Sequence, residues 1–117
     1  MRGYEVYKRV LNLLGYINND DSVTSDSALY NRAIYAINQI LLDLKQNEIE
    51  SMNDTINIPK AHAEALIYGV AMLLALVGGD GERNRFFTNI YNSKRSAALS
   101  EVDTVLDAMP NVDGGAI

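Results

Sequence analysis

The sequence predicts an all-α fold, a small bundle of four to five helices around a buried central helix. Apolar residues recur at helical spacing through most of the chain. Residues 65–77 carry no charge, so a helix there would be apolar on every side and buried all round. Only the stretch near 47–58 departs from this period, which predicts a short extended loop or hairpin excursion.

A chain of 117 residues is long enough for one domain with its own core. We expect a single helical domain over residues 1–110. Pro110 should end the last helix, and residues 111–117, which include Gly114 and Gly115, should form a flexible C-terminal tail.

The composition excludes several classes of protein. With 15 acidic and 10 basic residues, the net charge of -5 has the wrong sign for a surface that binds phosphate backbones throughout. The absence of cysteine excludes disulfides and thiolate metal sites. The N-terminus has a charged amphipathic pattern instead of a signal sequence, and the apolar run 65–79 is shorter than the roughly 20 residues that cross a bilayer. We therefore expect a cytoplasmic protein in which this run is core.

Amphipathic patterns predict the first two helices. Residues 4–16 place their apolar side chains on one half of the helical wheel, and a turn-rich loop at 18–22 ends this helix. That loop holds two acidic residues but lacks the EF-hand spacing, so we expect a solvated loop and no metal site. Thr24 or Ser25 can cap the second helix, which we expect over residues 26–46.

Two apolar residues of the second helix, Tyr35 and Leu42, lie outside its core stripe. They are two turns apart on a face that is otherwise polar. A narrow apolar strip on a polar face is what a contact between subunits needs. The alternatives are that both are isolated surface residues, or that the 49–58 loop folds over them.

The segment 47–59 breaks the helical pattern, because residues 56–58 alternate as a short extended piece does. It is either a hairpin-like excursion or a loop held down by its isoleucines. Pro59 favours extended geometry before it and a helix after it, so we expect the third helix over 59–77. His62 is the one histidine, and no cluster of carboxylates stands beside it to complete a metal site.

A glycine-rich turn separates the third helix from a fourth, which we expect over 81–97. Gly78 or Gly79 can take the left-handed conformation at the end of one helix, and Asp80 can cap the next. A phosphate-binding loop is excluded, because no Gly-Lys-Ser/Thr follows and no strand precedes the turn.

Arg83 and Lys94 are basic residues on the apolar arc of this fourth helix, which includes Phe86 and Phe87. Either their long side chains run along the edge of the arc to solvent, or they reach acidic partners within the fold or on a neighbouring subunit. Further along, Leu99 no longer falls on the apolar arc of this helix, and a capping-box-like pattern begins at Ser100. We therefore expect a short fifth helix over about 102–109.

No residue pattern predicts catalysis. Nucleophilic catalysis needs a base beside its serine, and the single histidine leaves only variants with a lysine or carboxylate base, none of which has a recognisable spacing here. No carboxylate pair stands in an apolar stretch where its pKa would be tuned. Basic residues cluster in the fourth helix at positions 83, 85, 94 and 95, but the net acidity and the aromatic neighbours favour a contact surface over DNA reading. We expect no enzyme activity, no cofactor and no metal. The candidate subunit-interface residues are Tyr35, Leu42, Arg83, Lys94 and Arg95.

Four stretches of the chain carry a resemblance to a known family. They are LNLLGY at Leu11–Tyr16, AINQILLDL at Ala36–Leu44, INIP at Ile56–Pro59, and ALIYGVAMLLALVGGDGERNRFFTNIYNSKR at Ala65–Arg95. In this order the chain resembles, over nearly its whole length, the small head-tail connector or adaptor proteins of tailed bacteriophages and prophages of Gram-positive bacteria. The matching features are packing and interface patterns, with no catalytic or metal signature among them.

The resemblance implies a structural function. Connector subunits form a homo-oligomeric ring, expected to be a dodecamer, beneath the phage portal protein. The ring extends the DNA channel and docks the stopper or tail-completion protein, and DNA passes through without sequence-specific binding. The implied location is the virion, and the host bacterial cytoplasm during assembly. The residues alone also allow another hypothesis, a small helical regulator that binds a protein or DNA partner as a dimer.

Overall fold

The computed structural model describes residues 1–15 and 27–108, and the side-chain surroundings of 1–15 and 29–100. It contains four helices, α1 (Gly3–Leu14), α2 (Ser27–Asp43), α3 (Lys60–Val77) and α4 (Gly81–Ala108). These described residues form a single isolated bridge, between Arg2 and Thr55, and no strand. The predicted all-α bundle is confirmed. The predicted loop at 18–22, the cap at Thr24 or Ser25 and the tail at 111–117 lie outside the described residues.

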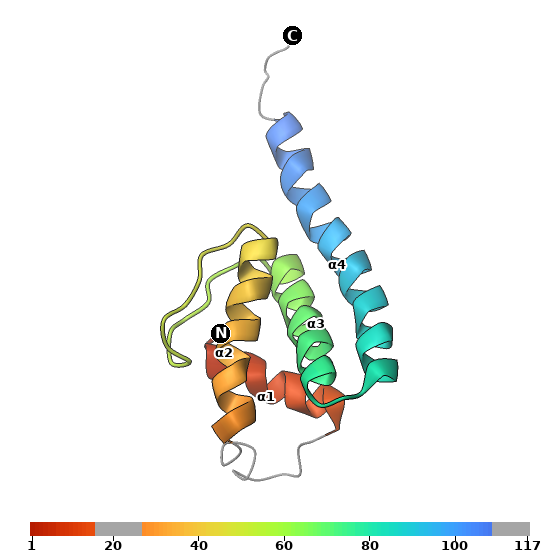
Figure 1. The fold of residues 1–117 in the computed structure, drawn as a ribbon. Coiled ribbons are helices and arrows are strands. Elements are labelled where there is room, and N and C mark those ends of the chain that lie inside the picture. The colour runs from red at the N-terminus through yellow and green to blue at the C-terminus, as the bar shows by residue number, and fades with distance from the viewer. Residues whose placement is uncertain (16–26, 109–117) are drawn as a thin grey trace.

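The centre of the bundle is α3. α4 runs back along it, α2 packs on its other side, and α1 crosses α2 and α3 at one end (Figure 1). The side of α3 that faces these helices is completely buried, and it includes Leu66, Val70 and Leu74. This central position is the reason for the apolar sequence of α3.

The prediction that α3 is buried all round is wrong. Its last turn exposes 61% of Leu76 and 46% of Val77, and Met72 and Leu73 are only partly buried. An apolar helix is enclosed only when enough neighbours surround it, and α1, α2 and α4 leave a strip of α3 open between α2 and α4.

Among the described residues, α3 is the one helix whose length and mean hydropathy of 1.5 would suit a membrane span. The central helix of a globular bundle meets the same criteria. In this chain 44% of the stretch is buried against the rest of the protein.

The ends of α1 and α2 are set by left-handed residues. Gly15 has a φ of 77° and ends α1. α2 ends at Asp43, earlier than predicted, because Lys45 has a φ of 62° and turns the chain. The backbone N–H of Gln46 then bonds to the carbonyl of Leu41 at 2.8 Å, which closes the last turn of the helix.

The turn between α3 and α4 has the predicted geometry. Gly79 is left-handed, with a φ of 77°. The side chain of Asp80 accepts the backbone N–H of Arg83 at 3.0 Å, and so caps the first turn of α4.

Residues 44–59 form a loop that folds back toward the start of α1 (Figure 1). The N–H of Ile56 bonds to the carbonyl of Met1 at 2.6 Å, and the N–H of Tyr4 bonds to the carbonyl of Met52 at 2.8 Å. The side chains of Met52 and Ile56 are buried. Of the two alternatives, the segment is thus a loop held down by its apolar side chains, and the N-terminal backbone is its partner.

α4 continues without a break to Ala108, so the predicted end near Ala97 and the separate fifth helix over 102–109 are wrong. The pattern at Ser100 resembles a cap, but a cap needs a residue outside helical geometry, and no glycine or proline interrupts the helix there. Ala98 is the last fully buried residue of α4 among those described. Beyond it the helix projects away from the bundle (Figure 1).

Candidate subunit interface

Tyr35 and Leu42, the apolar strip that the sequence indicated on α2, lie on the surface. Their exposed fractions are 76% and 57%. The loop after α2 attaches beside them instead of covering them. The Asn38 side chain accepts the N–H of Ile49 at 2.8 Å and donates to its carbonyl at 2.9 Å. The alternative that this loop buries the strip is therefore wrong.

α3 extends this apolar surface. A groove of about 460 Å³ lies between α2 and the last turns of α3. A second hollow adjoins it where α2, α3 and α4 meet, beside Leu42, Leu73 and Tyr91. The first groove is lined mainly by Arg32, Tyr35, Gln39, Leu73, Leu76 and Val77. We call the apolar residues Tyr35, Leu42, Leu73, Leu76 and Val77 the α2–α3 face.

Sequence reasoning found only the α2 half of this face. On α2 an apolar residue among polar ones is conspicuous, whereas on α3 every side is apolar and no pattern marks the side that stays open. Leu76 and Val77 could be identified only from the positions of the neighbouring helices.

Arg83 binds within its own chain. Its Nε lies 3.4 Å from a carboxylate oxygen of Asp80, one turn earlier. Its guanidinium also lies beside Gly15, where an added β-carbon would be 3.5 Å from a terminal nitrogen. The C-terminal end of a helix carries partial negative charge, which a nearby cation stabilises. The Arg83 guanidinium thus lies close to the C-terminal end of α1.

Lys94 also has a partner within the chain. Its Nζ lies 3.2 Å from Oε1 of Glu64 on α3 and 5.8 Å from the centre of the Tyr68 ring. Both ends of the ion pair are half-exposed, so water and salt weaken it. Lys94 therefore occupies the edge of the packed side of α4 and reaches an acid of its own fold.

Phe86, which the sequence places on the apolar arc of the fourth helix, lies largely in solvent. Its side chain is 60% exposed, and its ring lies edge-on against the buried ring of Phe87. The centres of the two rings are 5.2 Å apart. Of the two adjacent phenylalanines only Phe87 points at α3. The centre of its ring lies 6.1 Å from the centre of the Tyr68 ring. Neighbouring positions on a helix point about 100° apart, so the bundle buries one and leaves the other in solvent.

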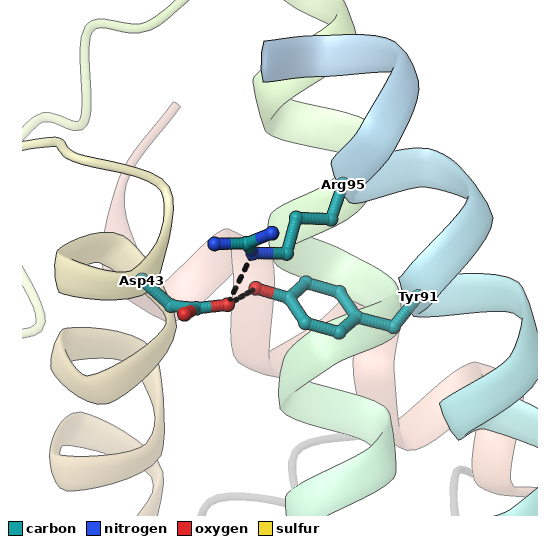
Figure 2. Close-up of polar contacts among 3 residues, drawn as sticks. All are labelled: Asp43, Tyr91 and Arg95. Carbon is teal, nitrogen blue, oxygen red and sulfur yellow. Dashed lines mark hydrogen bonds and ion pairs between the residues drawn. The ribbon is translucent and has the colours of Figure 1, made fainter. Parts of the chain in front are cut away.

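Arg95, the last candidate, belongs to a three-residue cluster that joins α4 to α2. Its Nε donates to Oδ2 of Asp43 at 2.8 Å, and the hydroxyl of Tyr91 donates to the same oxygen at 2.5 Å (Figure 2). Burial of Tyr91 and its bond to the Asp43 carboxylate raise the pKa of this phenol above its ordinary value, so that it remains a donor at neutral pH. No local sequence pattern connects Asp43 with Tyr91, and only the fold brings them together.

Within the described residues there is no group of three or more histidine, cysteine or acidic side chains that could hold a metal ion. His62 is 1% exposed, and neither ring nitrogen has a hydrogen-bond partner in the part of the chain that the structure describes. It lines none of the surface hollows described above. The α2–α3 face remains the extended apolar surface that the described residues expose.

No protein family, curated protein or solved structure matches the chain.

Proposed function

We propose that this chain is a structural subunit of a bacteriophage head-tail connector, a homo-oligomeric ring beneath the portal protein. The ring would extend the DNA channel and dock the stopper or tail-completion protein. The observation that carries the proposal is the α2–α3 face, because contiguous apolar side chains exposed beside a groove favour an interaction site. The resemblance of four stretches of sequence to connector proteins supplies the identity of the assembly.

The α2–α3 face has the composition of the centre of an interface. Its five residues are apolar, with the aromatic ring of Tyr35 exposed among them. Polar and charged side chains, Arg32, Gln39 and Asp43, line its two hollows together with the apolar ones. An apolar centre with a polar rim is typical of protein interfaces, and tyrosine is among the residues that contribute most to binding there.

The charges of the chain suit a channel through which DNA slides. Lys94 and Arg95 pair with Glu64 and Asp43 of the same chain. This pairing reduces the positive charge available for phosphate, and the total charge is -5. It also means that the neighbouring subunit is held mainly by apolar contact.

Assembly on the portal tests the proposal. The purified chain is mixed with the portal protein encoded by the same phage, and complexes are captured through the portal and imaged by electron microscopy. We expect rings seated on the portal. Failure of the wild-type chain to bind the portal would contradict the proposal, and a stable dimer that ignores the portal would favour the regulator hypothesis.

Tyr35→Glu places a charge on the α2–α3 face. Because Tyr35 is 76% exposed, the free energy of unfolding should change by less than about 0.5 kcal/mol. Ring assembly should be lost, since a carboxylate buried without a partner is strongly unfavourable. Asn92→Glu adds the same charge at an exposed position of α4 and should assemble as the wild type does. Normal assembly of Tyr35→Glu would show that another surface joins the subunits.

A further inference from the structure

α4 is tethered on two sides just before it leaves the bundle. Lys94 reaches Glu64 on α3, and the next residue, Arg95, reaches Asp43 on α2. Ala98, one turn later, is buried. From there α4 continues to Ala108, about 15 Å further at the rise of an α-helix, and projects from the bundle as an arm (Figure 1). We call this part of α4 beyond Ala98 the arm.

The contact with α2 restrains the orientation of α4 more than the contact with Glu64 on α3 does. Tyr91 and Arg95 are one turn apart on α4, and both donate to one oxygen of Asp43, the last residue of α2 (Figure 2). A phenol on a buried ring and the Nε of a planar guanidinium each accept little change of angle. Two such donors on one acceptor therefore restrain both the rotation and the tilt of α4.

A glycine of α3 makes this link possible. A β-carbon at Gly69 would lie 2.8 Å from Cε1 of Tyr91 and 2.8 Å from Cγ2 of Ile40, far inside normal contact. The Tyr91 ring thus crosses α3 at the one point where α3 has no side chain, and its hydroxyl arrives at the end of α2. The link from α4 to α2 depends on this close approach.

The cluster can be reached from outside. The side chains of Asp43 and Arg95 are 45% and 38% exposed. Asp43 and Tyr91 also line the hollow next to Leu42 and Leu73, which belong to the α2–α3 face. An occupant of that face would therefore meet the cluster directly.

We propose that Asp43, Tyr91 and Arg95 form a latch that sets the direction of the arm, and that opening this latch lets the arm pivot while α1, α2 and α3 stay packed. The contact of the buried Phe87 ring with Tyr68 of α3 keeps the start of α4 attached to the bundle when the latch opens. The latch is a property of the single chain. Its test needs no portal protein and is independent of the proposed connector function.

Distances between spin labels measure the direction of the arm. Because the chain has no cysteine, labels can be placed at two introduced ones, Asn31→Cys on α2 and Ser100→Cys on α4, both at exposed positions. With the latch intact, we expect a single narrow distribution of distances between the two labels. Asp43→Ala removes the acceptor of the hydrogen bonds from Tyr91 and Arg95, and it should broaden this distribution and shift its mean. Tyr91→Phe, which removes one bond, should have a smaller effect.

Two controls separate a pivot from other effects. Lys94→Met breaks the ion pair with Glu64 on the other side of α4 and should leave the distance narrow. A second label pair, Asn12→Cys on α1 with Asn31→Cys on α2, reports the rest of the bundle and should be the same in every variant. If Asp43→Ala fails to fold, Arg95→Gln tests the latch with a milder change.

The proposal is overturned if the distance between α2 and the arm stays narrow in folded Asp43→Ala or Arg95→Gln. It is also overturned if both label pairs broaden together, because the cluster would then support the whole bundle. An equal broadening in Lys94→Met would likewise show that the Asp43 cluster has no special part in directing the arm.

Discussion

Lys45 shows how one residue places the end of a helix. It has a φ of 62°, in the left-handed region, and the turn that it makes lets the N–H of Gln46 bond to the carbonyl of Leu41. A residue with a β-carbon is disfavoured in this conformation by about 1 kcal/mol, and glycine is not. The native lysine therefore holds a position that glycine fits better.

We predict that Lys45→Gly raises the free energy of unfolding by about 1 kcal/mol, because glycine removes the conformational strain at this position. Denaturation in urea, followed by circular dichroism, measures the change. Lys45→Ala removes the same charged side chain but keeps the β-carbon, so it should bring no gain. An equal gain in Lys45→Ala would assign the effect to the side chain.

Because of Tyr91, the free energy of unfolding should vary with pH in the alkaline range. Burial and the Asp43 carboxylate raise the pKa of its phenol in the folded protein, whereas in the unfolded chain the phenol ionises near pH 10. The folded state thus holds the proton more tightly. The stability that this provides is complete below about pH 10 and is lost as pH rises toward the folded pKa.

We predict that the unfolding free energy of the wild type falls more steeply between pH 9 and pH 11 than that of Tyr91→Phe, as the phenol of the unfolded chain ionises near pH 10. Urea denaturation at a series of pH values gives both curves. Lysines and other tyrosines titrate in the same range, so the difference between the two proteins is the informative quantity. Parallel curves would show that the phenol is not held by Asp43.

At the scale of the element, Gly69 decides how closely α2, α3 and α4 approach. Its missing side chain leaves room for both Tyr91 and Ile40. We predict that Gly69→Ala lowers the free energy of unfolding by about 1–3 kcal/mol, despite the higher helix propensity of alanine, because the new methyl group overpacks this crossing. Thermal or urea denaturation measures the loss.

Gly81 provides the matched control for this substitution. It is also a helical glycine, but a β-carbon there would meet nothing within 4 Å. Gly81→Ala should therefore be neutral or slightly stabilising. A loss of the same size at both positions would mean that the effect comes from the backbone and not from the crossing.

The helices themselves were largely predictable, and their ends were less so. The amphipathic patterns located α1 and α2, and Pro59 placed the start of α3, which begins at Lys60. The predicted break in α4 failed because a capping pattern competes with the hydrogen bonds of a continuing helix. Without glycine or proline nothing in the local sequence stops that helix.

At the scale of the whole molecule, the number of helices around α3 determines which of its side chains stay exposed. Three neighbours bury one side of α3, and the strip that they leave open joins the exposed residues of α2. Core residues such as Leu66 are buried and support folding, while Tyr35 and Leu76 stay exposed and would contact a neighbouring subunit in the proposed ring. This separation is why a substitution at Tyr35 can test the assembly without unfolding the chain.

The sequence by itself determined the fold class, the candidate strip at Tyr35 and Leu42, and the glycine turn at Gly79, because each follows from the local period of apolar residues or from backbone conformation. Only the tertiary structure decided which side of α3 stays open and which acid Arg95 binds. Asp43 and Arg95 are 52 positions apart, and their contact depends on how three helices pack at Gly69. Local patterns report what a segment can form, whereas burial and long-range pairing depend on the neighbours that the whole chain supplies.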